Sequence, residues 1–456
     1  MPEWLQHEGI DPVLDRIESL GARAIVTSPY LLDRVAAGEG AREPPPDGEA
    51  GRVRPLDRDL FGARELFVRT APAFVHDRAR YQGLRYQPAP PGDLTRAHAD
   101  LLDRMIEAAT RRGIAVYLQV MAASPPGYRV QFSGATEDDQ CLGPDGARHD
   151  ARVDRNASLA SRHVRAYVGT LLAELADRYP AVVGFRLDWP EYPPYDLKSA
   201  LFDFNPAAQA LMTELGADPS AVARATLDWL VEARAAASRA SETAAGVRAA
   251  LEPSWRTLFD PQSPLAPLFA AKRAASRALL AHCRGALDAL AGPRRRLEPQ
   301  AFPPPFDALS GFPLRELEGI ADAVGIKLYT MHWPMIARYW TRDLVGTMAG
   351  PHADAIALAI GALFDFIDAP TDPSKFRYPE AHEPHPVSHD AQRRKLDTAR
   401  AAAGAVPVIA FAHSYGPLAD VEARVALARE HGPAWINRYG YLSDEKLRAL
   451  SVATTA

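Results

Sequence analysis

The chain has 456 residues, of which 47% are hydrophobic and 24% are charged, with a formal net charge of -5 at pH 7. This is ordinary globular composition, long enough to bury a large core, and the slight acidity argues against a nucleic-acid partner. The two cysteines lack CxxC or Cys/His spacing, which argues against a disulfide framework and against a structural zinc site.

The N-terminal segment has none of the features of a targeting signal. Residues 1–17 lack the basic start and the apolar core of a signal peptide. Elsewhere in the sequence no apolar run reaches the length that spans a membrane. We therefore expect a cytoplasmic protein without a membrane partner.

Eight segments have the apolar or alternating pattern of strands, and most of them follow a stretch with helical periodicity. In chain order the strands are expected at residues 22–28, 65–70, 114–121, 182–188, 296–301, 323–330, 406–412 and 434–439. Helices are expected at residues 101–112, 161–179, 315–321, 392–403 and 421–430. Strands that alternate with helices indicate a parallel sheet of the α/β class, and eight such units predict a (β/α)8 TIM barrel.

One segment is too long for an ordinary crossover. Residues 206–290 are rich in Ala, Arg and Leu and have a mostly helical pattern. We interpret them as a helical insertion between the fourth and fifth strands, packed outside the barrel. Residues 1–456 then form a single catalytic barrel domain.

The inward faces of the strands follow from burial. The outer face of a barrel strand meets helices and must be apolar, so its polar alternates point inward. These are Arg69 on strand two, Gln119 on three, Arg186 and Asp188 on four, Glu298 and Gln300 on five, Lys327 and Tyr329 on six, and Asn437 on eight. A purely structural barrel fills its interior with branched apolar side chains, so this set predicts a polar ligand site at the carboxyl ends of the strands. For any one member, a satisfied interior ion pair is the alternative.

The fourth strand and the residues after it resemble glycosidase sequences. Residues 184–188, Gly-Phe-Arg-Leu-Asp, resemble the fourth-strand motif of the alpha-amylase superfamily. Residues 188–193, Asp-Trp-Pro-Glu-Tyr-Pro, are similar to the Asp-Trp-Glu-Tyr-Pro strand end of family-eighteen-type chitinases, with Pro190 inserted. Residues 178–192 resemble the fourth strand of barrel beta-galactosidases, and the whole chain looks like the "hypothetical glycosyl hydrolase" barrels. The resemblance implies a hydrolase of O-glycosyl bonds that acts on an oligo- or polysaccharide.

The chain also departs from each of these patterns. Val183 and Arg186 occupy the places of the upstream chitinase acids. After strand seven the other two families carry an acid, and here His413 stands alone. No single catalytic set is complete, so a sugar-binding barrel that has lost catalysis remains an alternative.

Glycoside cleavage requires one carboxylic acid to protonate the leaving oxygen and one carboxylate to attack or to guide water. In the amylase-like pattern Asp188 is the nucleophile, and Arg186 would hold it ionised. Glu191 or Glu298 would be the proton donor. The aromatic neighbours of Glu191 give it a less polar setting, which would raise its pKa toward the donor range.

Polar and aromatic side chains at or just after strand ends are candidates to bind the substrate, because they hydrogen-bond to sugars and stack on their rings. They are Arg69, Gln119, Arg186, Trp189, Tyr192, Gln300, Lys327, Tyr329, His332, Trp333, His413 and Asn437. The sequence has neither a Gly-rich phosphate loop nor an HExxH motif, so we expect no cofactor and no metal. The expected partner is a carbohydrate, and the sugar, the linkage and the oligomeric state stay open.

Lys327 suggests a different chemistry. A strand-six lysine is where class I aldolases carry their Schiff-base amine, so an aldolase or lyase is the second hypothesis. Asp188 and Glu298 at the same mouth would keep the amine protonated, which is why we place this hypothesis below the glycosidase.

Overall fold

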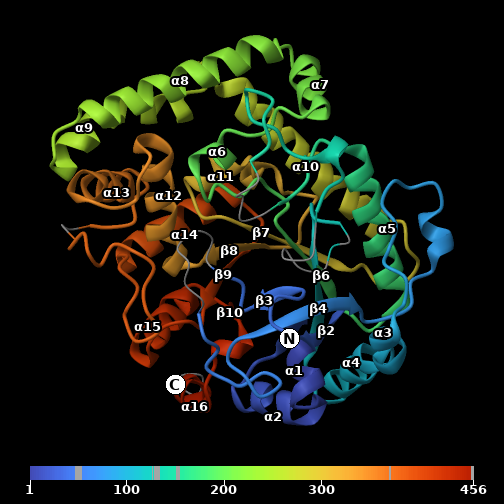
Figure 1. The fold of residues 1–456 in the computed structure, drawn as a ribbon. Coiled ribbons are helices and arrows are strands. Elements are labelled where there is room, and N and C mark those ends of the chain that lie inside the picture. The colour runs from blue at the N-terminus through green and yellow to red at the C-terminus, as the bar shows by residue number, and fades with distance from the viewer. Residues whose placement is uncertain (47–53, 126, 128–133, 150–154, 369–370, 453–456) are drawn as a thin grey trace.

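The computed structural model describes residues 1–46, 54–125, 127, 134–149, 155–368 and 371–452. Its main sheet has seven parallel strands in the order β1, β5, β6, β7, β8, β9, β10. Their bounds are β1 (Ala24–Thr27), β5 (Ala115–Met121), β6 (Gly184–Asp188), β7 (Arg296–Ala301), β8 (Val324–Leu328), β9 (Val408–His413) and β10 (Ala434–Asn437). The sheet is curled and covered by helices (Figure 1), as in part of a TIM-like barrel.

Seven of the expected strands lie in this sheet, and the second does not. Residues 65–70 fall in β4 (Leu66–Pro72), which pairs antiparallel with β2 (Tyr30–Val35) and β3 (Ala41–Glu43) in a separate sheet. A parallel neighbour of β1 needs a long crossover, usually a helix, and the segment after β1 forms two strands instead. The prediction of residues 65–70 as a barrel strand is therefore wrong.

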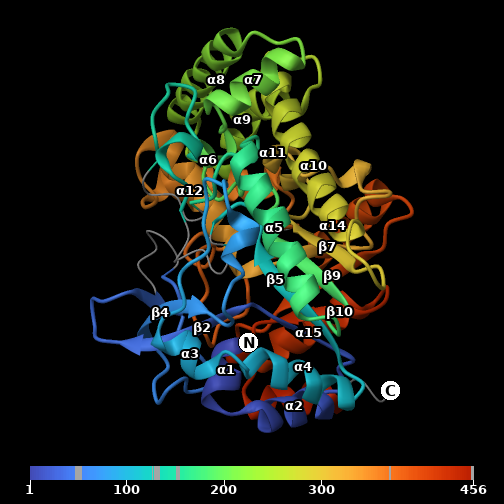
Figure 2. The same ribbon diagram turned by 90° about the vertical axis from the view of Figure 1, so that its right-hand side faces the viewer.

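The helices form the outer layer of the molecule (Figures 1 and 2). They are α1 (Pro2–His7), α2 (Ile10–Ser19), α3 (Asp93–His98), α4 (Leu101–Arg111), α5 (Arg162–Arg178), α6 (Leu197–Ala200), α7 (Pro206–Glu214), α8 (Pro219–Arg239), α9 (Ala244–Phe259), α10 (Ala266–Asp288), α11 (Phe306–Ser310), α12 (Trp333–Val345), α13 (Pro351–Leu363), α14 (His389–Ala403), α15 (Leu418–Arg429) and α16 (Asp444–Val452). Several begin at a capping side chain. Ser161 accepts from two backbone N–H groups of α5, and Ser388 accepts from one of α14. None of the described helices has both the length and the apolar character needed to cross a membrane.

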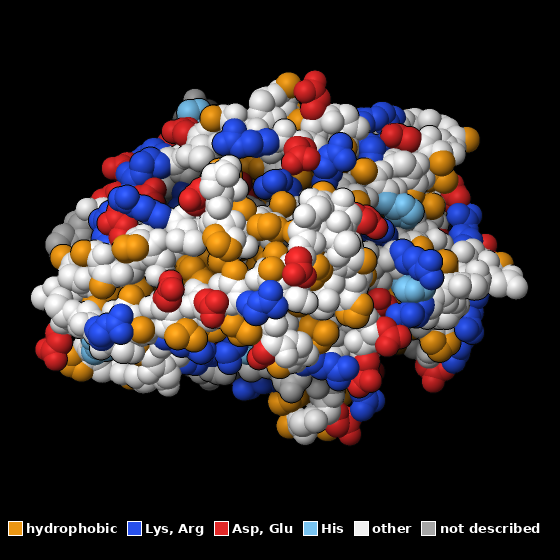
Figure 3. Space-filling model, turned by 90° about the horizontal axis from the view of Figure 1, so that it is seen from above, with side chains coloured by type: hydrophobic (Ala, Val, Ile, Leu, Met, Phe, Trp, Pro, Cys, Tyr) orange, Lys and Arg blue, Asp and Glu red, His pale blue; other side chains and the backbone are white. Residues whose placement is uncertain are grey.

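Residues 206–290 contain four helices with two different surroundings. The last of them, α10, packs along α5 (Figure 2) and so belongs to the helical layer that leads into β7. The others extend beyond the sheet, where α8 packs on α12 and α9 packs on α13. Figure 3 looks down on this end and shows charges of both signs among scattered hydrophobic side chains. That the whole run is an insertion remains a prediction.

The register of the parallel strands sets up the site. Gln119, Arg186 and Glu298 are paired across β5, β6 and β7, so their side chains lie in one row. Asp188 pairs with Met121 one row closer to the carboxyl ends of the strands. Paired residues of a parallel sheet face the same side, which gives the interior a lower row and an upper row of polar groups.

Candidate active site

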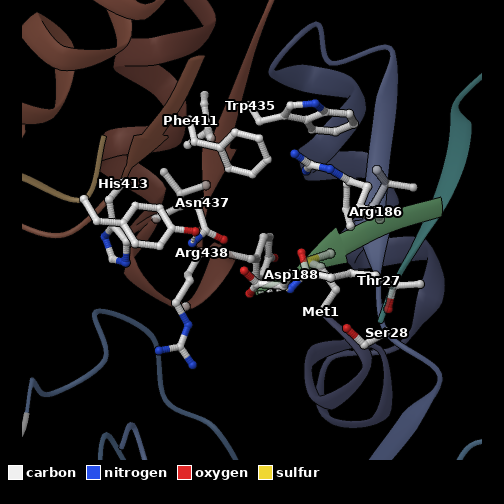
Figure 4. A pocket seen from close by; sticks show the side chains of 18 of the residues that line it. Met1, Thr27, Ser28, Arg186, Asp188, Phe411, His413, Trp435, Asn437 and Arg438 are labelled. Carbon is white, nitrogen blue, oxygen red and sulfur yellow. Dashed lines mark hydrogen bonds between the residues drawn. The ribbon is translucent and has the colours of Figure 1, made fainter. Parts of the chain in front are cut away.

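The carboxyl ends of five parallel strands border a cavity of about 1350 Å³. Its wall includes Asp188 and Trp189 at the end of β6, Tyr329 after β8, His413 on β9 and Asn437 on β10. Figure 4 shows Asp188, His413 and Asn437 around this space. The fold thus brings polar side chains from distant segments together at the C-terminal ends of the strands. This is the end at which barrel enzymes bind their ligands.

Asp188 is the carboxylate with the most direct access to the cavity. Its Oδ1 lies 2.8 Å from Nζ of Lys327, and its side chain is 17% exposed. The amide of Gln119 donates to Oδ2 at 3.4 Å, and the backbone N–H of Trp189 donates to Oδ1 at 3.1 Å. Trp189 has a φ of 53°, a left-handed conformation that bulky residues rarely adopt. Strain of this kind is concentrated at functional sites.

Among the described residues no hydrogen bond or ion pair joins Arg186 to Asp188, although the two charges attract each other. The Arg186 side chain points to the centre of the barrel (Figure 4), with its guanidinium carbon 3.8 Å from the Phe411 ring centroid and 4.4 Å from that of Trp435. Burial lowers the pKa of Arg186 to about 10. Any side chain at Gly325 would collide with the Phe411 ring, so this position keeps room for the stack. Strand alternation predicts correctly that Arg186 faces the interior. The long side chain places its guanidinium over Phe411 and Trp435 and not beside Asp188.

Glu191 lies behind the cavity wall. It has no exposed surface, its Oε1 accepts from the backbone N–H of Phe302 at 2.9 Å, and its Oε2 accepts from Oγ of Ser310 at 2.7 Å. Nζ of Lys327 is 3.8 Å from Oε1. Burial raises the pKa of Glu191 to about 7, although Lys327 and the two hydrogen bonds act in the opposite direction. The carboxyl group is therefore divided between its protonated and charged forms near neutral pH.

Glu298 borders the cavity one row below Asp188. Nε of Arg296 is 3.0 Å from its Oε1, and among the described residues no hydrogen-bond partner is found for its buried Oε2. In the same part of the interior the amide of Gln300 donates to Oε1 of Gln119 at 2.8 Å. Glu298 thus borders the cavity below the mouth but is itself almost fully buried, whereas Glu191 is at the level of the mouth and enclosed.

A third group of side chains completes the mouth opposite Asp188. The amide of Asn437 donates to Oη of Tyr329 at 2.7 Å, and the Tyr329 ring lies 5.3 Å from the His413 ring. Nδ1 of His413 accepts from the backbone N–H of Tyr415 at 3.0 Å. Burial, together with nearby arginines, holds the pKa of His413 well below its usual value. The imidazole is therefore neutral and carries its proton on Nε2. His332 also borders the cavity.

Five expected binding residues are not on the cavity wall. Lys327 and Gln300 are buried and contact the wall residues Asp188 and Gln119, and the other three lie elsewhere. Arg69 is on the antiparallel sheet, where it is exposed and pairs with Glu39 at 2.9 Å. Tyr192 is buried, and its hydroxyl donates to Asp203 at 3.3 Å. Trp333 begins α12 and stacks on Phe366 in the packing of that helix. Arg69 misses the mouth because its strand belongs to the other sheet, whereas Tyr192 and Trp333 follow strands of the main sheet but turn into the packing around it.

Other wall residues were not among the predicted candidates. Tyr117, Phe411 and Trp435 line the interior, and Glu43 and Arg438 form an ion pair at 2.7 Å on the cavity wall. Alternation could have indicated Phe411 and Trp435, because each precedes a predicted inward residue by two positions. Glu43 comes from β3, and no sequence signal connects that strand with the mouth. Among the described residues, no group of three or more His, Cys, Asp or Glu side chains is placed to hold a metal ion.

No family model and no curated protein matches the sequence. Solved structures that match include a beta-galactosidase from Marinomonas ef1, at 15% identity and a TM-score of 0.32 over 51% of this chain and 34% of that one. The chain thus spans about a third of that enzyme. The PgaB (BpsB) glycoside hydrolase domain from Bordetella bronchiseptica matches at 14% identity and a TM-score of 0.37, over 93% of both chains. The catalytic domain of beta-amylase from Paenibacillus polymyxa matches at 11% identity and a TM-score of 0.43, over 76% of this chain and 82% of that one. The matched structures are glycoside hydrolases, but likenesses this distant say nothing about the activity of this chain.

Proposed function

We propose that the protein hydrolyses a glycosidic bond of an oligo- or polysaccharide, with Asp188 as nucleophile or charge stabiliser. The observation that carries the proposal is the position of Asp188 on the wall of a large polar mouth, ion-paired to the buried Lys327. A carboxylate at this place on the wall can face a positive oxocarbenium-like transition state. The left-handed backbone at Trp189 is consistent with a strand end shaped by function rather than by packing.

Glu191 is our candidate for the proton donor. A donor must hold a proton near neutral pH, and the burial that raises the pKa of Glu191 to about 7 provides this. The same amine lies near both carboxylates, which keeps Glu191 close to Asp188. Because Glu191 lies behind the wall, the segment from Trp189 to Tyr195 must shift for it to reach a leaving oxygen. Glu298, which is already on the wall but paired with Arg296, is the alternative donor.

A non-catalytic sugar-binding barrel is the second candidate function. The enclosure of Glu191 favours it, because both of its oxygens already accept hydrogen bonds from Phe302 and Ser310. In that case the mouth would still offer amide, hydroxyl and aromatic groups to a sugar.

The test is a panel of nitrophenyl glycosides and oligosaccharides, with uronic acids included, assayed for both turnover and binding by the wild-type protein. Turnover of at least one glycoside supports the proposal. Binding of an oligosaccharide without turnover would select the sugar-binding barrel. If no sugar is bound or cleaved, both candidates fail.

A further inference from the structure

The cavity does not stop at the mouth. Its wall continues down β1 and β10 to the amino-terminal ends of the strands, where it includes Leu20, Ala24 and Ala434. An ordinary barrel fills this space with side chains from all its strands. Here, within the described part of the chain, β1 and β10 stand at the two ends of the strand order and form no ladder with each other. A space is left between them.

Aromatic rings separate this space from the centre of the sheet. The Tyr117 and Trp435 ring centroids are 5.6 Å apart, which joins β5 to β10 across the interior. Arg186 stacks on Trp435 and on Phe411 and fills the centre behind them. The open volume therefore lies between this cluster and β1. We call it the apolar slot, and its wall includes Leu20, Ala24, Val26, Ala434, Trp435 and Ile436.

Except for Leu20, which is buried, the side chains of the slot wall are only half-buried, which shows that the slot is unfilled. On β1, Ala24 and Val26 are half-buried whereas Ile25 and Thr27 are buried, and all four residues of β10 are half-buried. Among the described residues, Val26 and Trp435 are also outside the hydrophobic core clusters. Apolar side chains on strands inside a helical layer are normally covered. A contiguous apolar surface left open in this way indicates a ligand site.

We propose that the apolar slot binds the apolar aglycone of a glycoside whose sugar occupies the mouth at Asp188. The slot and the mouth are one continuous cavity, so a single molecule can reach both. Apolar side chains of β1 and β10 form the slot, and Arg23 and Arg429 also border the cavity beside the starts of these strands. The carbon surface suits an alkyl or aryl group and not a second sugar, whose hydroxyls would lose their hydrogen bonds there. The proposal rests on the proposed function and narrows its substrate class to amphiphilic glycosides.

Direct binding tests the slot without any need for turnover. The uncharged fluorophore N-phenylnaphthylamine should bind to the wild-type protein with enhanced emission, and n-alcohols should displace it. From n-butanol upward, each added methylene should strengthen competition by about fourfold until the slot is full, as expected for burial of a CH₂ group. Absence of fluorophore binding, or competition that does not depend on chain length, would overturn the proposal.

Variants locate the binding. Val26→Trp should fill the slot and weaken fluorophore binding by about tenfold or more. Val231→Trp is the matched control, because Val231 on α8 is 65% exposed and remote from the slot, so binding there should be unchanged. If Val26→Trp fails to fold, as judged by circular dichroism, Ala434→Phe replaces it. Equal binding by the filled variant and the control would refute the slot.

Asp188→Asn separates this proposal from the proposed function. The variant should bind the fluorophore as the wild type does, because Asp188 is at the mouth and not in the slot. Fluorophore binding that Val26→Trp removes, in a protein that cleaves no glycoside, would leave the slot as an apolar site and remove its link to a glycosidase. Glycoside cleavage without fluorophore binding would refute the slot alone.

Discussion

Two neighbouring carboxylates at the end of β6 share one lysine but occupy different surroundings. Asp188 is on the cavity wall, partly exposed, with its oxygen 2.8 Å from Nζ of Lys327. Glu191 is behind the wall, without exposed surface, and 3.8 Å from the same nitrogen. Burial raises the pKa of Glu191 to about 7 despite the nearby cation. Two acids only three residues apart in the sequence therefore differ mainly in their access to the cavity.

The largest expected effect is on cleavage rate when the proton donor is removed, and it depends on the leaving group. Glu191→Gln should slow cleavage of glycosides with poor leaving groups by about 10²–10⁴-fold, the usual contribution of a general acid. Activated aryl glycosides need little protonation and should be cleaved almost as before. The measurement is kcat/KM for matched alkyl and nitrophenyl glycosides. Glu298→Gln is the control, and a leaving-group dependence that appears there instead would transfer the donor role to Glu298.

The second effect concerns stability. Lys327→Met removes the cation that lies between Asp188 and Glu191 and leaves buried negative charge without compensation. We expect a loss of about 3–5 kcal/mol in the free energy of unfolding, measured by urea denaturation at pH 8. Adding Glu191→Gln should recover part of that loss, because one of the two uncompensated acids is then neutral. If Lys327→Met is as stable as the wild type, the lysine does not compensate the charges of the two carboxylates.

A smaller effect is the pH dependence of stability. The pKa of Glu191 is raised in the folded protein, so its protonated form is favoured there, and the resulting stability is present in full below the unfolded pKa near 4.5. This contribution is lost as the pH rises through about 7. The difference in unfolding free energy between wild type and Glu191→Gln should therefore change across this window, by at most about 3 kcal/mol. A difference that stays constant with pH would mean that Glu191 is not shifted.

The smallest expected effect is a null result that separates the glycosidase from an aldolase. Nζ of Lys327 is buried in an ion pair with one carboxylate and close to another, so it is not free to attack a carbonyl group. Borohydride reduction in the presence of carbonyl substrates should leave the mass of the peptide that contains Lys327 unchanged. A covalent adduct on Lys327 would move the account to Schiff-base chemistry.

Local patterns in the sequence predict much of the sheet. The run from Val182 to Asp188 is apolar enough to indicate a buried parallel strand, and β6 lies there. The same kind of pattern fails for β4, because its antiparallel partners come from residues 30–43 and no local signal reports that pairing. The open space beside β1 arises because β4 pairs with β2 and β3 instead of with β1. That pairing joins distant segments, so no single segment predicts it.

Alternation predicts which face a side chain takes but not how far it reaches. Arg186 and Asp188 share a face, yet the long guanidinium extends to Phe411 and Trp435 while Asp188 meets Lys327 from another strand. The position of Glu191 depends on the turn at Trp189, where an uncommon backbone conformation redirects the chain. Composition alone gives no sign of that turn.

The most direct test of the central claim is the separation of turnover from binding in Asp188→Asn. On whichever glycoside the wild type cleaves, kcat should fall by more than about 10³-fold, because the amide keeps the shape of the side chain but cannot act as a carboxylate. The dissociation constant for the same oligosaccharide, measured by titration calorimetry, should change by less than about tenfold, since the rest of the mouth is intact. A variant that retains wild-type kcat would contradict the assignment of Asp188 as the catalytic carboxylate.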